Sequence, residues 1–440
     1  MFAATHSAGF LLTAVVAVAA VALPAAASDR DEFAAVAARA RRLTRSSKAT
    51  PAVRAAMLAE LAGHATPEAA SLIAAVGFAA ADAATRTAAR AVVVERLADP
   101  AVKARLLADW RRQSARPTPG TADLGLALVV ADAPAGRGEF RELIDTLPRG
   151  PLLAWMAAIC DAAVRSGDAA AVPAVRSLAT LRCFSTSLAC RRGVIETLAR
   201  MRGPEAIAAL LDIFEGLEGE ARGDVVRHLV AVSGAQHGTD VGAWRSWFAA
   251  HGGPAGPAPA AAPPPPAGRD SSQADYYDIP IYADRVVFVL DTSASMEGPR
   301  LETAKRELMS AIFALPPETA FTVVFFNSGV GPWRNVLVPA TDANKRQAMA
   351  FVDGLPAEGR TATSDALEAA FRFDAEAVFL LSDGEPTVGR IVEPAGIVAF
   401  VTELNRGRAV TVNTIGIMTG PGFLDRLAQA NHGTFRAVDE

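Results

Sequence analysis

The stretch VVFVLDTSASME, residues 286–297, joins an apolar run to a polar one. Its first half is mostly β-branched, which predicts a strand that is buried on both faces of a sheet. Its second half places Asp291, Ser293 and Ser295 two positions apart, so three side-chain oxygens follow the strand. Because Asp and Ser are also ordinary turn and helix N-cap residues, this string does not define a site by itself.

Similar apolar runs recur through the last third of the chain. We expect strands at residues 286–290, 321–326, 336–338, 377–381, 410–416 and 434–438. Between them, amphipathic patterns predict helices at residues 299–314, 344–354, 364–371, 394–405 and 422–431. This alternation predicts a Rossmann-like, doubly wound α/β fold, with a mostly parallel sheet and helices on both faces.

Two further polar loops are expected at the same edge of this sheet. Residues 358–365, EGRTATSD, offer the hydroxyl of Thr361 after Gly359, and residues 380–386, LLSDGEP, place Asp383 after an apolar run. Ligands of such sheets bind beyond the carboxyl ends of the strands. The three loops are therefore the candidate site.

These loops resemble the three metal-site motifs of the von Willebrand factor type A (VWA) domain family, in the family's order. The matching residues are DTSASM at 291–296, GRT ending at Thr361 and LLSDG ending at Gly384, and the resemblance covers residues 284–440. It implies a metal-ion-dependent adhesion site whose ligands are Asp291, Ser293, Ser295, Thr361 and Asp383. It also implies that nearby side chains brace the loops without binding metal, namely Asn327, Asp365 and Ser382.

The residue types suit the implied site. The three loops contain no His or Cys, and hard oxygen donors favour Mg²⁺, with Mn²⁺ or Ca²⁺ as substitutes. Three neutral hydroxyls and two carboxylates would leave the coordination shell of Mg²⁺ incomplete. A carboxylate from a partner could then complete the coordination of the ion.

The region before the VWA-like segment is expected to be all-α. Residues 29–250 show apolar residues at helical spacing, with helix starts at Thr66-Pro67, near Pro173 and at Gly203-Pro204. The last two breaks are about 35 residues apart, so the segment resembles HEAT repeats. An irregular helical bundle is the alternative. Residues 251–275, rich in Pro and Ala, predict a linker, and the VWA domain is then assigned to residues 276–440.

The N-terminus predicts export. Residues 10–23, FLLTAVVAVAAVAL, are too short to span a bilayer comfortably, and an A-x-A motif follows at residues 25–27. We therefore assign residues 1–27 to a signal peptide and expect a periplasmic, cell-surface or secreted protein without a transmembrane span in the mature chain. No Lys or Arg precedes the run, so an uncleaved membrane anchor is the alternative.

The cysteines give less information. The chain has three cysteines, namely Cys160, Cys183 and Cys190, and an odd number cannot form a complete disulfide framework. We expect all of them to be buried small residues. A break in the helix at residues 184–186 is the alternative that would bring Cys183 and Cys190 together.

These features predict a non-enzymatic, exported binding or scaffold protein. Its VWA domain would use a divalent cation to capture a Glu or Asp carboxylate of a protein partner, and the formal net charge of −4 gives no sign of nucleic-acid binding. One alternative is a metal-assisted hydrolase with a general base among Glu297, Glu385 and Asp365. Another is an intracellular partner of a ring ATPase, a role of some VWA relatives, against which the apolar N-terminus argues.

Overall fold

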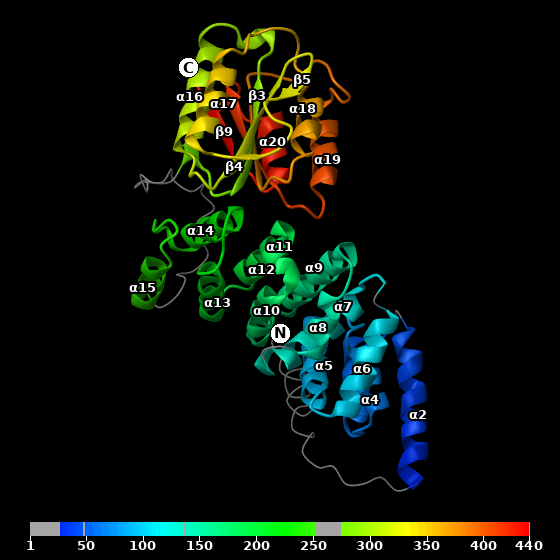
Figure 1. The fold of residues 1–440 in the computed structure, drawn as a ribbon. Coiled ribbons are helices and arrows are strands. Elements are labelled where there is room, and N and C mark those ends of the chain that lie inside the picture. The colour runs from blue at the N-terminus through cyan, green and yellow to red at the C-terminus, as the bar shows by residue number, and fades with distance from the viewer. Residues whose placement is uncertain (1–26, 47–48, 114, 136–137, 252–273, 440) are drawn as a thin grey trace, which may run out of the picture. The chain divides into compact units, whose positions relative to one another are not determined.

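The computed structural model describes residues 27–46, 49–113, 115–135, 138–251 and 274–439 (Figure 1). The predicted signal peptide and most of the predicted linker lie outside the described residues. The chain divides into two compact units, one with residues up to Thr186 and Gly193–Ile213, the other with Ser187–Arg192 and the residues from Phe214 onward. Within the described part of the chain, no helix combines the length and hydrophobicity that a membrane span requires.

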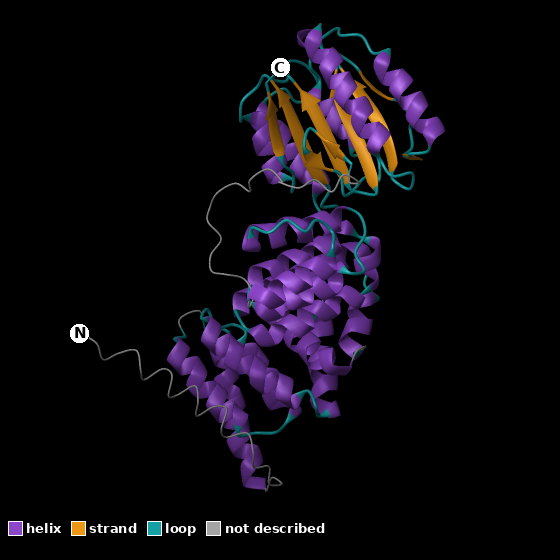
Figure 2. Ribbon diagram, turned by 90° about the vertical axis from the view of Figure 1, so that its left-hand side faces the viewer, coloured by secondary structure: helices purple, strands orange, loops and turns teal. Residues whose placement is uncertain are grey.

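The described residues of the first unit form helices and the loops that connect them, without a strand (Figure 2). Its α-helices are α2 (Ala27–Thr44), α3 (Pro51–Ala62), α4 (Pro67–Gly77), α5 (Ala83–Arg96), α6 (Pro100–Arg112), α7 (Pro119–Asp132), α8 (Glu139–Asp145), α9 (Arg149–Ser166), α10 (Val172–Ser177), α11 (Arg182–Thr186), most of α12 (Leu188–Met201) and α13 (Pro204–Phe214). Short 3-10 turns join them at η1 (Ala133–Ala135), η2 (Ala169–Ala171) and η3 (Leu178–Thr180). The predicted all-α region is thereby confirmed.

Capping residues explain where several of these helices begin. The hydroxyl of Thr66 accepts a hydrogen bond from the backbone N–H of Ala69 at 3.1 Å, and Pro67 occupies the first helical position of α4. Helix α13 begins at Pro204, as predicted. Helix α4 packs against α3, α5 and α6, and α7 packs against α5 and α9. Helices that pack mainly with near neighbours in the chain are what stacked helix pairs require.

An aromatic cluster forms part of the core of the helical unit. The rings of Trp110 and Phe140 lie 4.9 Å apart, edge to face, and those of Trp110 and Trp155 lie 4.8 Å apart. Trp110 is 1% exposed, and Phe140 and Trp155 are fully buried. Large buried aromatic side chains remove much apolar area from water, so this cluster stabilises the packing of α6, α8 and α9.

Trp155→Ala is expected to lower the free energy of unfolding of the helical unit by about 3–5 kcal/mol, because the cavity would remain unfilled. Denaturant unfolding followed by circular dichroism measures this loss. Val53→Ala is the control, since Val53 is 50% exposed on α3 and should change stability little. Equal stability of the Trp155 variant and the wild type would contradict the assigned core.

The cysteines correct one expectation. Cys183 and Cys190 are disulfide-bonded, whereas Cys160 is a buried free thiol whose pKa burial raises to about 11. Helix α11 ends at Thr186 and α12 begins at Leu188, so one helix does not carry both residues. All three cysteines are buried, as expected, but Cys183 and Cys190 are not free thiols, and the alternative of a break in the helix between them accounts for their disulfide.

The second unit contains the α/β fold. Its main sheet has the strand order β5-β4-β3-β7-β8-β9, with β6 also paired to β4. The strands are β3 (Arg285–Asp291), β4 (Ala320–Phe326), β5 (Val330–Pro332), β6 (Val338–Pro339), β7 (Ala377–Ser382), β8 (Thr411–Ile417) and β9 (Phe435–Val438). The helices of the second unit are α14 (Glu220–Ser233), α15 (Val241–His251), α16 (Pro299–Ala314), α17 (Asp342–Asp353), α18 (Thr363–Ala370), α19 (Pro394–Asn405) and α20 (Phe423–Ala430).

The sheet is covered on both faces, as Figure 2 shows. Alternate residues of β3 enter two separate cores. Phe288 and Leu290 pack with residues of α16 and α17, whereas Val287 and Val289 pack with residues of α18, α19 and α20. The predicted doubly wound α/β arrangement is confirmed, and the β-branched run at residues 286–290 is buried for this reason.

The parallel register brings the carboxyl ends of three neighbouring strands to the same level. Strand β3 lies between β4 and β7 and runs parallel to both, with Leu290 opposite Phe325 on one side and Leu381 on the other. The residues that follow these strands therefore leave the sheet at the same edge. This register places the loops after β3 and β7 side by side, whereas the loop of Thr361 connects α17 to α18 and reaches the first loop through backbone hydrogen bonds.

Short strands were the part of the sheet that the sequence did not predict well. The strand expected at residues 336–338 is instead β6 at Val338–Pro339, and the edge strand β5 was not expected. The antiparallel pair β1 (Asp275–Tyr276) and β2 (Ile279–Pro280) was also not expected. Tyr276 is 2% exposed, and its ring lies 5.6 Å from that of Phe288, so this segment belongs to the core of the α/β domain.

Candidate metal centre

Asp291 ends β3 and is fully buried. Its Oδ1 accepts the backbone N–H of Ser293 at 2.8 Å, and its Oδ2 accepts the hydroxyl of Ser382 at 2.5 Å. Ser382 is the last residue of the neighbouring strand β7. The carboxylate is thus held in one orientation by the turn that follows it and by the adjacent strand.

The two serines of the first loop extend this arrangement. Ser293 precedes the 3-10 turn η4 (Ala294–Met296), and its hydroxyl lies 3.1 Å from that of Ser295. The hydroxyl of Ser295 donates to Oδ1 of Asp383 at 2.8 Å. Side-chain hydrogen bonds therefore join β3 to β7 at their last residues and the first loop to the loop after β7.

Backbone hydrogen bonds attach the loop of Thr361 to the first loop. The N–H of Ala294 donates to the carbonyl of Gly359 at 3.1 Å, and that of Glu358 donates to the carbonyl of Thr292 at 2.9 Å. Gly359 has φ +74°, and an added Cβ would lie 2.8 Å from the hydroxyl oxygen of Ser328, so only glycine fits easily. Thr361 follows two residues later and is 5% exposed.

The residues expected to brace the loops make contacts of their own. Oδ1 of Asn327 accepts the N–H of Gly329 at 2.9 Å, and the carbonyl of Asn327 accepts the N–H of Ala362 at 3.0 Å. Oδ1 of Asp365 accepts the N–H of Arg390 at 2.8 Å. Asn327 thereby connects the loop after β4 to the loop of Thr361, and Asp365 fixes the segment before α19.

Two acidic side chains and one arginine set the charge of the site. Burial raises the pKa of Asp291, and the nearby carboxylate of Asp383 adds to this effect, although hydrogen bonds from Ser382 and Ser293 oppose it. Asp383 also pairs with Arg300 at 3.2 Å. The described residues hold no group of three or more His, Cys, Asp or Glu side chains that could bind a metal. A cation at the strand ends would therefore depend on hydroxyl oxygens together with the two carboxylates, and these donors fit Mg²⁺.

Asp291→Asn is expected to raise the free energy of unfolding at pH 7 in the presence of a chelator, because it removes a buried charge. The pKa of Asp291 is raised on folding, so the wild type loses stability as pH rises through the folded-state pKa. The gain is about 1.4 kcal/mol for each unit by which the folded pKa exceeds the unfolded one. Urea unfolding of both proteins at several pH values measures it.

The difference between the two proteins should disappear below the ordinary Asp pKa of about 3.9, where Asp291 is protonated in both states. Asp374→Asn is the control for loss of a carboxylate, because the side chain of Asp374 is 92% exposed. A variant that is less stable than the wild type at pH 7 would show that the carboxylate is stabilising without a metal.

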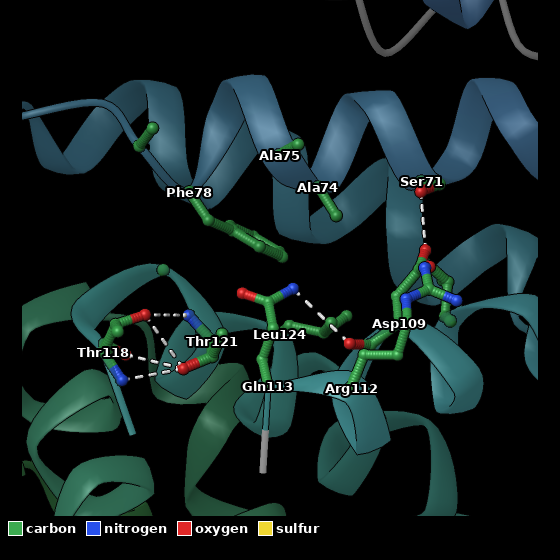
Figure 3. A pocket seen from close by; sticks show the side chains of 13 residues that line it. Ser71, Ala74, Ala75, Phe78, Asp109, Arg112, Gln113, Thr118, Thr121 and Leu124 are labelled. Atoms are coloured by element: carbon green, nitrogen blue, oxygen red, sulfur yellow. Dashed lines mark hydrogen bonds and ion pairs between the residues drawn. The ribbon is translucent and has the colours of Figure 1, made fainter. Parts of the chain in front are cut away.

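A hollow away from the candidate centre lies in the helical unit. Figure 3 shows this cavity of about 320 Å³ between α4, α6 and α7. The carboxylate of Asp109 there accepts hydrogen bonds from Ser71 at 2.5 Å and from Arg105 at 3.2 Å, and Arg112 also donates to it. These groups satisfy one another, so the cavity offers no evident site for a charged ligand.

The residues considered as general bases lie in two kinds of surroundings. Glu297 and Glu385 are exposed, and Oδ1 of Asp365 is occupied by the N–H of Arg390 and the hydroxyl of Ser364. Arg300 is the residue at this site that the sequence did not single out. The available signal was a basic residue in the first turn of a helix, where acidic residues are favoured.

The parallel sheet and the loops at its edge define the C-terminal region as a VWA domain. Residues 284–437 match the family described as von Willebrand factor type A domain, as the sequence predicted. Human inter-alpha-trypsin inhibitor heavy chain H4 is 31% identical over 169 residues, which cover 35% of this chain and 18% of the relative. Human von Willebrand factor A domain-containing protein 3A is 33% identical over 162 residues, 35% of this chain and 13% of the relative.

One solved structure is similar to about a third of the chain. The von Willebrand factor type A protein from Catenulispora acidiphila is 26% identical, with a TM-score of 0.33, and the match covers 36% of this chain and 38% of that one. The chain spans less than a fifth of the length of either curated relative. The similarity is therefore one of the VWA domain.

Proposed function

We propose that this chain is an exported, non-enzymatic binding or scaffold protein whose VWA domain uses Mg²⁺ to capture a Glu or Asp side chain of a protein partner. Mn²⁺ or Ca²⁺ would serve as substitutes. The observation that carries the proposal is one hydrogen-bonded cluster of oxygen donors at the ends of two adjacent parallel strands, formed by Asp291, Ser293, Ser295, Ser382 and Asp383.

The proposed ligands are Asp291, Ser293, Ser295, Thr361 and Asp383. Mg²⁺ prefers six oxygens in octahedral geometry and keeps exchangeable positions when the protein supplies only some of them. The neutral hydroxyls reduce its charge little, so the bound ion would supply a strong attraction for an anionic oxygen. Asn327, Asp365 and Ser382 would hold the loops in place through the contacts described above.

Binding is favoured over hydrolysis by the surroundings of the site. The nearest candidate bases, Glu297 and Glu385, are exposed and therefore surrounded by water. A general base must be held within hydrogen-bond reach of the proton that it removes. No described hydrogen bond or ion pair orients either side chain, so capture of a ligand is the simpler use of the site.

The disulfide supports export. Disulfides persist mainly in oxidising compartments and are rare in the cytosol, and Cys183 and Cys190 are disulfide-bonded. This also disfavours an intracellular partner of a ring ATPase. We propose residues 1–27 as the signal peptide, 29–250 as a HEAT-like scaffold, 251–275 as the linker and 276–440 as the VWA domain.

Mg²⁺ is expected to stabilise the wild type by about 1.4 kcal/mol at ten times its Kd, through mass action. Asp291→Ala should abolish this gain because it removes an anionic ligand. Thr361→Ala should reduce the gain less, because water can replace a neutral oxygen. Thr402→Ala, on the surface of α19, is the matched control and should respond as the wild type does. Scanning calorimetry with MgCl₂ or chelator measures these shifts, and a response of Asp291→Ala equal to that of the wild type would refute the site.

Capture of a partner is tested by a pull-down from the envelope fraction of the native host. We expect a protein that is retained by the wild type in MgCl₂, released by chelator and not retained by Asp291→Ala. Blocking exposed carboxylates of the envelope proteins before the pull-down should also prevent retention. Retention that is equal in MgCl₂ and in chelator would mean that the partner binds another surface.

A further inference from the structure

Arg300 contacts the candidate metal centre directly. It is the second residue of α16, and its Nη1 donates to the carbonyl of Ser295 at 3.0 Å and to Oδ2 of Asp383 at 3.2 Å. The side chain of Asp383 is 2% exposed and that of Arg300 is 34% exposed. Because Ser295 donates to the other oxygen of Asp383, both oxygens of this carboxylate already have a partner.

The position of Arg300 is unfavourable for the helix that carries it. The N-terminal end of a helix has a partial positive charge, which favours acidic residues and repels cations. Gly298, the residue before α16, makes no side-chain cap, and Glu302 supplies the acidic charge of the first turn. Helix stability therefore does not explain why a guanidinium lies here, whereas its ion pair with Asp383 does.

We propose that Arg300 determines the specificity of this site by competing with the divalent cation for Asp383 and by making the loaded site selective for one carboxylate. This inference rests on the proposed function, since it concerns the same ligands. It adds a residue and a form of regulation that the ligand set alone does not contain.

Competition follows from the charge that surrounds Asp383. A guanidinium 3.2 Å from its Oδ2 neutralises the carboxylate that the cation needs. A divalent ion bound by Ser295 and Asp383 would lie close to the same guanidinium, and like charges at such separations repel strongly where water is partly excluded. Arg300 must therefore weaken the affinity of the site for the cation.

Selectivity follows from the net charge of the three charged side chains at the site. Asp291, Asp383 and Arg300 together carry one negative charge, and a divalent cation would change it to one positive charge. A single carboxylate would then neutralise the loaded site. Without Arg300, the loaded site would already be neutral and would attract an acidic ligand less. Cation and acidic ligand should therefore strengthen each other's binding through Arg300.

An alternative role for Arg300 is structural, as a contact that attaches α16 to the first loop. In that case, Arg300 would hold Ser295 in place through its carbonyl, and its removal would weaken cation binding. The two roles therefore predict changes of opposite sign in the Kd for Mg²⁺. A single substitution separates them.

The experiment measures the Kd for MgCl₂ by isothermal titration calorimetry in the full chain. We expect Arg300→Gln to bind Mg²⁺ about tenfold more tightly than the wild type, equivalent to about 1.4 kcal/mol. Arg300→Lys keeps the charge and should remain close to the wild type. Arg306→Gln is the matched control, because Arg306 is exposed on the same helix and donates to Thr303 rather than to Asp383.

A second arm tests selectivity with acetate as the probe. At constant ionic strength, acetate should tighten Mg²⁺ binding to the wild type by a larger factor than binding to Arg300→Gln. An equal or larger Kd for Mg²⁺ in Arg300→Gln would overturn the competition, and an equal effect of acetate would overturn the selectivity. Absence of Mg²⁺ binding in the wild type would instead refute the proposed function itself, so the two failures are distinguishable.

Discussion

The parallel pairing of β3 with both of its neighbours is the constraint on which the candidate site depends. Leu290 lies opposite Phe325 and Leu381, so β3, β4 and β7 end at the same level. Asp291 can accept the hydroxyl of Ser382 only because these strands are adjacent and in this register. A shift by one residue would turn Asp291 toward the other face of the sheet and place an apolar residue at its position.

The site keeps an unfavourable charge arrangement that a structural turn would not need. Two carboxylates lie close together, and burial together with Asp383 raises the pKa of Asp291. Hydrogen bonds from Ser293 and Ser382 offset part of this cost, and Arg300 offsets more of it at Asp383. Buried polar groups that conflict with stability are common where a protein binds something, because the ligand supplies the missing interaction.

The sequence predicted the long elements well because each carries a repeated signal. The buried strands at residues 286–290 and 377–381 are continuous apolar runs, and the helix expected at residues 394–405 matches α19. Short strands such as β5 have too few residues to show a repeated pattern. The break before α12, which lies between the bonded residues Cys183 and Cys190, is not marked by Gly or Pro. The loops of the site were predicted from their residue types, whereas the metal ligands remain a prediction.

Arg300 shows why the charge of a site is harder to predict than its donors. A motif contains the donors, since Asp291, Ser293 and Ser295 are neighbours in the chain. The ion pair between Arg300 and Asp383 joins residues that are far apart in the sequence. In the sequence alone, Arg300 resembles any solvent-exposed residue of an amphipathic helix. Only the fold brings its guanidinium to Asp383. The donors of such a site define which ion it accepts, but a cation supplied by the protein sets how tightly the ion binds and what charge the loaded site presents. If affinity for the ion is weakened in this way, the ion and its acidic ligand are held best when both are present.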